Sequence, residues 1–350
     1  MPKIGQVWHF TGWLRQSVTT VVAGLLFAQP LHAADDALPL HLIADVPLSG
    51  RATRFDYESV APDSHRLYIA HLGDSSVTVF DTNTQKVIGD ISGIGHVHGV
   101  LRIASLSRIY ASATQTNEVV AIDEKSLLIE ARMPGGIYPD GMAYAPEMHR
   151  LYVSDETGLT ESVIDTETEK LIATIPLGTM AGNSQFDSIS KHIFVAGQSL
   201  NQLIEIDPEK NTIIARYDLS EADGPHGLYI DPDSRQAFVA CEGNNLLVVF
   251  DLMSMRVTSS FPVAGDPDVL AFDSELHRLY VAGEKGVVSV FSVVHGDTRK
   301  LGEGFVGPNA HVVAVDQRTH RVYFPLKDLR GGPALRIMEP VKEMPSIDSH

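Results

Sequence analysis

The chain has 350 residues, of which 44 are Asp or Glu and 27 are Lys or Arg, so its formal net charge is −17. A surface with this excess of acid repels nucleic-acid phosphates and anionic lipid headgroups, so the composition argues against nucleic acid as a partner. Cys241 is the only cysteine, which excludes an intramolecular disulfide and leaves apolar packing to stabilise the fold.

The N-terminal segment has the order of residues found in secretory signals. Lys3 and Arg15 come first, an apolar stretch follows at 18–28, and small residues follow at 31–35. This order is typical of a cleaved signal peptide, and the apolar stretch is too short for a stable transmembrane helix. We therefore predict a signal peptide over residues 1–34, a periplasmic or secreted product, and no insertion into the membrane. An uncleaved N-terminal anchor is the alternative.

A repeated motif with a central aromatic residue dominates the rest of the chain. His-Arg-Leu-Tyr occurs at 65–68, 149–152 and 277–280, and four related motifs lie between and after these. The seven aromatic anchors are separated by 42, 42, 42, 44, 42 and 43 residues: Tyr68, Tyr110, Tyr152, Phe194, Phe238, Tyr280 and Tyr323. A period in the low forties, with strand-like stretches and turn residues at regular spacing, predicts a β-propeller of seven blades.

Each repeat is predicted to form four antiparallel strands, as the third repeat illustrates. An apolar stretch at 141–144 precedes the strand that contains Tyr152, a third strand ends at Asp165, and a fourth strand follows at 170–175. The alternation of β-branched or aromatic residues with Gly, Pro and Asp turns favours strands over helices throughout.

The two ends of the repeat array are predicted to meet in one blade. The seventh repeat has no fourth strand after 335–338. The N-terminal segment 41–48, however, is nearly identical in sequence to 170–177, which contains the fourth strand of the third repeat. Pairing of the N-terminal strand with the last repeat removes the sheet edge that an open ring exposes. The sequence therefore predicts one all-β, seven-bladed propeller over residues 35–343 and a loose C-terminal tail over 344–350.

These repeats resemble the YVTN-type repeats of the bacterial YncE-like β-propeller proteins. The resemblance rests on the Arg-Leu-Tyr-Val-Ala-like anchors, on third strands that end in Asp, and on the segments Gly-Pro-His-Gly-Leu at 224–228 and Ala-Phe-Val-Ala-Cys-Glu-Gly-Asn at 237–244. It covers essentially the whole chain after the signal peptide. It implies the propeller fold and no particular enzyme, since propellers host many unrelated functions.

One position in each repeat, twelve residues before the anchor, is predicted to begin the innermost strand at a mouth of the central channel. Six of the seven residues there are Asp or His: Asp56, His98, Asp140, Gly182, His226, Asp268 and His311. The histidines come from repeats two, five and seven, which is nearly a threefold array. Because imidazoles in such an array bind Zn²⁺, Cu²⁺ or Fe²⁺, we predict that His98, His226 and His311 hold one divalent transition metal.

The aspartates of this ring are the candidate catalytic residues. Asp140 or Asp268 would accept a proton from the substrate or from water, and Asp56 would orient a histidine ring. Gly182 would leave a gap for the substrate. The alternatives are that these aspartates only stabilise the turns that begin the strands, that the mouth is a polar pocket without a metal, and that the histidines are unrelated surface residues.

Three further residues are predicted near the same mouth. His96 lies two residues before His98, and His71 and Cys241 each follow their anchor by three residues. These side chains would contact the metal or the substrate, and a thiolate at Cys241 would favour copper. The alternative for Cys241 is a small apolar residue buried in the core.

Together these features predict an exported metalloenzyme with zinc or copper at the channel mouth. By analogy with propeller lactonases, streptogramin lyases and the zinc-dependent peptidylglycine lyase, the expected reaction is lyase or hydrolase chemistry on a small molecule. Two alternatives remain open from the sequence. One is a non-catalytic periplasmic propeller that binds a small ligand or a protein, and the other is a protein that binds or delivers metal.

Overall fold

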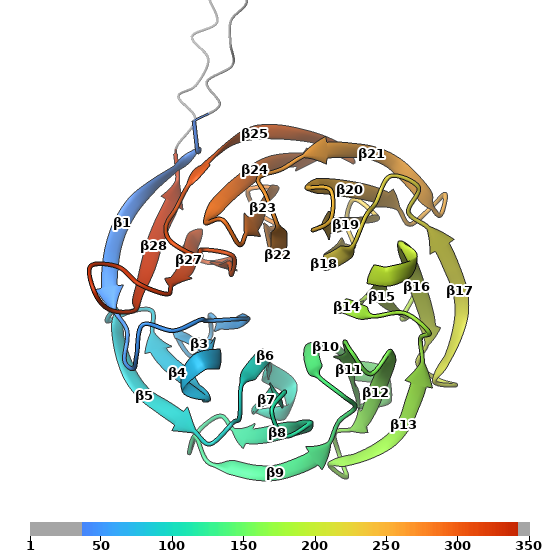
Figure 1. Cartoon of the computed structure of the whole chain (residues 1–350), viewed down its shortest axis with the longest axis horizontal. Helices are drawn as coiled ribbons and strands as arrows, with labels where there is room; N and C mark the ends of the chain where they lie inside the picture. Colours follow the sequence, from blue (N-terminus) through green and yellow to red (C-terminus); the bar gives the residue numbers. More distant parts are fainter. Residues whose placement is uncertain (1–36, 342–350) are drawn as a thin grey trace, which may run out of the picture. The chain divides into compact units, whose positions relative to one another are not determined.

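The computed structural model describes residues 37–341, and it shows the predicted seven-bladed propeller (Figure 1). Seven antiparallel sheets of four strands each surround a central channel. The predicted signal peptide (1–34) and tail (344–350) lie outside the described residues. Among residues 37–341, no helix is long and apolar enough to cross a membrane.

The first three blades each place their four strands in chain order from the channel outward. Their strands are β2 (Glu58–Ala61), β3 (Arg66–His71), β4 (Ser76–Asp81) and β5 (Lys86–Ser92); β6 (Val97–Ile103), β7 (Arg108–Ala113), β8 (Glu118–Asp123) and β9 (Ile129–Pro134); and β10 (Pro139–Ala145), β11 (Arg150–Asp155), β12 (Thr160–Asp165) and β13 (Lys170–Pro176).

The next three blades repeat this order. Their strands are β14 (Ala181–Phe186), β15 (Ile193–Gly197), β16 (Gln202–Asp207) and β17 (Thr212–Asp218); β18 (Pro225–Asp231), β19 (Gln236–Cys241), β20 (Leu246–Asp251) and β21 (Arg256–Pro262); and β22 (Pro267–Asp273), β23 (Arg278–Gly283), β24 (Val287–Val294) and β25 (Asp297–Phe305). Four short 3-10 helices lie in connections between strands: η1 (Leu72–Asp74), η2 (Ala104–Leu106), η3 (Pro146–Met148) and η4 (Gln198–Leu200).

The seventh blade closes the ring as predicted. It contains β26 (Ala314–Asp316), β27 (Arg321–Leu326) and β28 (Ala334–Pro340), and the N-terminal strand β1 (Leu40–Pro47) is its outermost strand. β1 pairs antiparallel with β28, from Leu40 opposite Pro340 to Pro47 opposite Ala334. The two ends of the described chain are thus joined in one sheet, which removes the free edge of an open ring.

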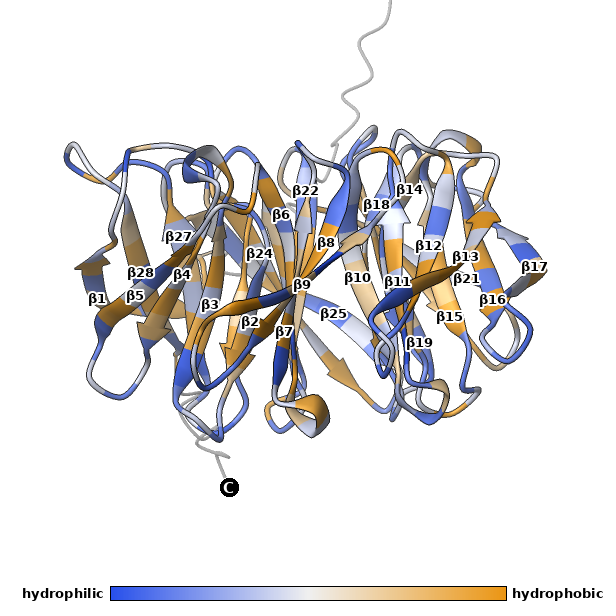
Figure 2. Cartoon of the chain, turned by 90° about the horizontal axis from the view of Figure 1, so that it is seen from below, coloured by the Kyte–Doolittle hydropathy of each residue, from blue (hydrophilic) through white to orange (hydrophobic). Residues whose placement is uncertain are grey.

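The core lies between neighbouring blades, where the second strands carry the aromatic anchors. All seven anchor side chains are at most 1% exposed. Each packs with apolar residues of an adjacent sheet, as Tyr280 does with Phe324 between blades six and seven. Figure 2 shows the same division, with apolar strands in the body of the ring and hydrophilic loops at its two faces.

A β-bulge at the start of the inner strands positions the residues at the channel mouth. In β10, Pro139 pairs with Asp155 and the next pair is Met142 with Val153, so Asp140 lies outside the ladder. The same irregularity occurs at the equivalent place in β6, β14, β18 and β22. Such bulges redirect side chains, and in these five blades they take the residue at the ring position out of the strand ladder.

Candidate metal centre

The six Asp and His residues expected at the channel mouth are all buried there. His98, Asp140, His226 and Asp268 are the second residues of their inner strands, whereas Asp56 and His311 precede β2 and β26. Their exposed fractions range from 0% to 9%: Asp56, His98, Asp140, His226, Asp268 and His311. Groups with this polarity need partners when buried, so their contacts show which of them are satisfied.

His226 lies between two aspartates. Its Nδ1 is 3.1 Å from Oδ1 of Asp268, and its Nε2 is 4.0 Å from Oδ2 of Asp140. Neither the Nδ1 nor the Asp268 Oδ1 has a hydrogen-bond partner besides the other atom of this pair. Burial disfavours the charged imidazole, but the carboxylates of Asp268, Glu242 and Asp140 outweigh it and raise the pKa of His226 to about 10.

The pKa values of the two aspartates beside His226 are shifted in opposite directions. Burial, together with the charge of Asp56, holds the pKa of Asp140 well above its usual range. Burial also acts on Asp268, but its contact with His226 outweighs burial and lowers the pKa of this carboxyl. Asp140 is therefore the protonated member of the pair and Asp268 the carboxylate, a division typical of acid and base roles.

His311 presents an unpartnered nitrogen to the same Asp268. Its Nδ1 is 3.0 Å from the carbonyl oxygen of Asn309, which can only accept a hydrogen, so Nδ1 carries one. Its Nε2 has no hydrogen-bond partner and lies 3.8 Å from Oδ2 of Asp268. The His311 side chain is 0% exposed, so this nitrogen has no access to solvent in compensation.

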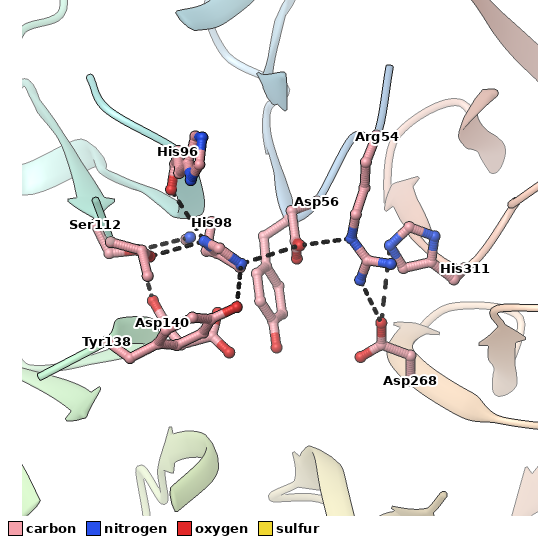
Figure 3. A network of polar contacts seen from close by, with 12 residues as sticks. Arg54, Asp56, His96, His98, Ser112, Tyr138, Asp140, Asp268 and His311 are labelled. Atoms are coloured by element: carbon pink, nitrogen blue, oxygen red, sulfur yellow. Dashed lines mark hydrogen bonds and ion pairs between the residues drawn. The ribbon is translucent and has the colours of Figure 1, made fainter. Parts of the chain in front are cut away.

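His98 has a similar ring orientation but is satisfied on both nitrogens. Its Nδ1 is 3.0 Å from the carbonyl oxygen of His96 and 2.7 Å from Oγ1 of Thr114. Its Nε2 is 3.1 Å from the Tyr138 hydroxyl, which donates to it when Nδ1 carries the hydrogen. Oδ2 of Asp56 is 3.9 Å from the same Nε2 (Figure 3).

Arg54 is a cation inside this acidic mouth. It comes from the connection between β1 and β2, which runs inward from the outer strand to the channel (Figure 1). Its Nε is 3.4 Å from Asp56 and its Nη2 is 3.9 Å from Oδ2 of Asp268 (Figure 3). Its Nη1 also contacts Glu284. These carboxylates raise the pKa of Arg54 despite its burial.

Two glutamates at the mouth were not predicted from the sequence. Oε1 of Glu242 is 3.6 Å from Nδ1 of His226, and Oε2 of Glu284 is 3.9 Å from Nδ1 of His311. Both lie four residues after an aromatic anchor, and Glu156 holds the same position in the third repeat. Three glutamates at seven equivalent positions are a signal that the repeat alignment could have found.

Within residues 37–341, two groups of side chains place ligand atoms within 4.8 Å of one another. One is His226, Glu242 and Asp268, and the other is Asp268, Glu284 and His311. Neither contains His98, so the structure does not bring the three predicted histidines together as one ligand set. The donor atoms and the buried atoms without partners do fit a divalent cation, since nitrogen and carboxylate ligands suit Zn²⁺ and related ions.

Cys241 and His71 do not reach this centre. Cys241 is 0% exposed, packs in the apolar core with Leu219 and Ala237, and its thiol lies 3.7 Å from the carbonyl oxygen of Val239. Burial raises the pKa of Cys241 to about 12, so it remains a thiol. His71 stacks on Phe55, and its Nε2 is 2.9 Å from Oγ1 of Thr53. Neither side chain belongs to the two groups of candidate ligands, so their predicted contact with a metal or substrate stays a prediction.

His96 and Gly182 also differ from expectation. His96 is exposed, with a φ of 45°, and it serves the centre through its carbonyl oxygen rather than its ring. Gly182 does not open a gap, because a Cβ there would lie 2.6 Å from the carbonyl oxygen of His226. Its neighbour Asn183 accepts a hydrogen bond from the hydroxyl of Tyr57, which comes from blade one.

Two cavities adjoin the cluster. One, of about 420 Å³, is lined by Arg54, His96, His98, Thr114 and Tyr138, among others. The other, of about 310 Å³, lies in the channel and is lined by inner-strand residues of all seven blades. Tyr57 and Asn183 line the channel cavity too, so their hydrogen bond spans the ring beside the charged cluster.

Comparisons with known proteins support the fold alone. No protein-family model and no curated protein matches the chain. The chain is similar to the solved structure of Kuenenia stuttgartiensis hydrazine synthase, with 17% identity over 81% of this chain and 94% of that one and a TM-score of 0.69. It is also similar to the RRP9 WD40 repeats, with 10% identity over 86% and 100% of the two chains and a TM-score of 0.71. Membership of the YncE-like family stays a prediction.

Proposed function

We propose that this chain is an exported β-propeller that binds a divalent transition metal at its channel mouth and hydrolyses or cleaves a small molecule there. The observation that carries the proposal is the meeting of His226, Glu242 and Asp268, whose ligand atoms lie within 4.8 Å of one another. His226 Nδ1 and Asp268 Oδ1 lie 3.1 Å apart and have no hydrogen-bond partner outside the proposed ligand set, so no other residue competes for these two ligand atoms.

Zinc is the metal that this ligand set favours. One imidazole and two carboxylates are borderline to hard donors, and three protein ligands leave a coordination position open, as in catalytic zinc sites. The case for copper rested on a thiolate at Cys241, which lies in the core as a protonated thiol.

A bound ion of this kind lowers the pKa of water or polarises a substrate oxygen. The protein's own residues supply the remaining parts. Asp140 faces His226 from the side opposite Asp268, and its raised pKa suits it to give a proton to a leaving group rather than to accept one. The cavity of about 420 Å³ beside His98 and Tyr138 offers room for a small substrate.

A non-catalytic binding role is the second candidate, and one observation favours it. Arg54 already pairs with Asp56, Asp268 and Glu284, so part of the acidic cluster is neutralised within the chain itself. A mouth that is satisfied in this way would serve as a polar surface for a small ligand or a periplasmic protein, which is the role that the YncE-like resemblance allows.

Metal analysis separates the two candidates. The mature protein would be purified from periplasmic extract without a histidine tag and analysed by mass spectrometry, beside Glu242→Gln and the control Glu167→Gln, which alters an exposed turn residue. We expect at least one equivalent of zinc in the wild type and the control, and a loss in Glu242→Gln. A hydrolase and lyase substrate screen would follow. Absence of metal from the wild type, even after reconstitution, would exclude the metalloenzyme.

A further inference from the structure

We propose that the channel mouth holds two divalent cations bridged by Asp268, and that Arg54 occupies the second position until an ion displaces it. This inference rests on the metal site proposed above. It adds a second ion, with Glu284 and His311 as its ligands, and a residue of the chain that controls its entry.

The orientation of Asp268 is the first argument. Its Oδ1 lies 3.1 Å from Nδ1 of His226, and its Oδ2 lies 3.8 Å from Nε2 of His311. The two oxygens of one carboxylate therefore belong to two different groups of ligands. A carboxylate in this arrangement is the usual bridge of two-metal sites, in which the ions lie about 3.5–4 Å apart.

The second argument is the unpartnered nitrogen of His311. The carbonyl oxygen of Asn309 fixes the hydrogen on Nδ1, so in the neutral ring Nε2 offers a lone pair toward Asp268. A histidine whose other nitrogen donates to a backbone carbonyl is the common arrangement of metal ligands. His98 has the same arrangement, but its Nε2 is taken by Tyr138, so it offers no free donor.

Arg54 is the third argument, because it is a cation already held at this place. Its guanidinium lies 3.9 Å from the same Asp268 oxygen that faces His311 (Figure 3). The guanidinium also contacts Glu284. Arg54 comes from the irregular segment 48–57, and its side chain is 37% exposed, so it can leave toward solvent without breaking a strand. Like charges repel, so the ion and the guanidinium exclude each other.

The charge of the mouth can support two ions once Arg54 has left. Arg54 ion-pairs with three carboxylates of the cluster, those of Asp56, Asp268 and Glu284, which its departure frees. Glu156 and Glu242 add two further carboxyl groups beside Asp140 and Asp268. Two-ion sites of this kind hold both the attacking and the leaving oxygen in hydrolysis of phosphate esters and peptides. The second ion therefore favours hydrolysis over elimination as the reaction.

The test is a titration of the metal-free protein with Zn²⁺ in competition with a chromophoric chelator. Wild type is expected to bind one ion tightly and a second weakly. Arg54→Gln should tighten the second binding at least about tenfold, because the competing cation is gone, while Arg54→Lys should not. Arg51→Gln is the matched control, since Arg51 lies in the same segment but pairs with Asp74 and has a 73% exposed side chain. Glu284→Gln should remove the second ion only.

Circular dichroism would confirm that each variant is folded, and Mn²⁺ loading would give a second readout through the coupled electron-spin spectrum of a close pair. One ion in both wild type and Arg54→Gln would overturn the two-ion inference and leave the single-metal proposal standing. No ion in any folded variant would overturn both. A second ion whose affinity is unchanged in Arg54→Gln would overturn the role of Arg54.

Discussion

Gly227 and Asp268 touch across the boundary between blades five and six. A Cβ built on Gly227 would lie 1.8 Å from the carbonyl oxygen of Asp268, far inside any permitted contact. Gly227 directly follows His226, so the close approach of β18 to β22 also sets the distance between His226 and Asp268. Because Gly227 has no side chain, β18 and β22 can approach closely enough to bring His226 and Asp268 together.

Gly227→Ala is therefore expected to disturb the centre and the fold at once. The added methyl group must either push β22 away from β18 or distort the bulge at the start of β18. We expect this to lower the unfolding free energy by about 1–3 kcal/mol and to weaken metal binding. Urea unfolding and metal titration measure the two effects. Gly332→Ala is the control, because a Cβ there meets nothing within 4 Å. Equal behaviour of the two variants would show that the contact does not position Asp268.

His226 and His98 occupy equivalent positions in their blades but are expected to differ in metal binding. His226→Ala should weaken the tighter site by more than about tenfold, since even partners of ligands contribute about 10–100-fold. His98→Ala should leave the affinity unchanged within error, because its Nε2 is bonded to Tyr138. The measurement is competition with a chelator at fixed pH. A loss of affinity in His98→Ala as large as in His226→Ala would restore the three-histidine site.

Cys241 is expected to be unreactive in the folded protein. Its side chain is fully buried and its pKa is raised to about 12, so little thiolate forms at neutral pH. A disulfide reagent such as dithionitrobenzoate should label no thiol in the native protein and one in urea. Cys241→Ala should keep the metal content of the wild type. Rapid labelling of the native protein, or loss of metal in the alanine variant, would place the thiol at the mouth.

Most of the fold could be predicted from the sequence repeat, because every blade uses the same pattern of strands, turns and buried aromatic residues. The anchors, the Gly and Pro turns and the duplicated fourth-strand string were enough to predict the blade count and the pairing of β1 with β28, which the structure confirms. The residues that pack between blades recur at a fixed period. A strand that is ambiguous in one repeat can therefore be assigned from its equivalents in the other repeats.

The centre was harder to predict, because it depends on differences between repeats. Sequence alignment selected His226, Asp268 and His311, which the structure brings close to one another, but it could not show that Tyr138 satisfies His98. It also overlooked Arg54, because none of the six equivalent positions, two residues before the ring position in the other repeats, is Lys or Arg. Side-chain direction after a β-bulge is not set by spacing alone, so contacts across the channel had to come from the structure.

The ion pair between Asp187 and Arg235 gives a test of the blade interface in acid. Arg235 donates to both oxygens of Asp187, at 2.7 and 2.9 Å, and the Asp187 side chain is 0% exposed. Burial alone would raise the pKa of Asp187, but the hydrogen bonds of Arg235 and Ser190 outweigh it and lower the pKa to about 2. A depressed folded-state pKa stabilises the protein above the unfolded value, near pH 4, and that stability is lost as the pH falls toward 2.

Asp187→Asn is accordingly expected to lower the unfolding free energy by about 2–4 kcal/mol at pH 6, because it leaves the guanidinium of Arg235, whose side chain is only 18% exposed, without its counter-charge. The difference from wild type should shrink by about 2 kcal/mol as the pH falls from 5 to 2, because the wild-type carboxyl then becomes protonated as well. Urea unfolding at several pH values measures this. Glu147→Gln, in the exposed pair with Lys191, should change stability by less than about 1 kcal/mol at every pH. A difference between Asp187→Asn and wild type that stays constant with pH would mean that this pair does not titrate on unfolding.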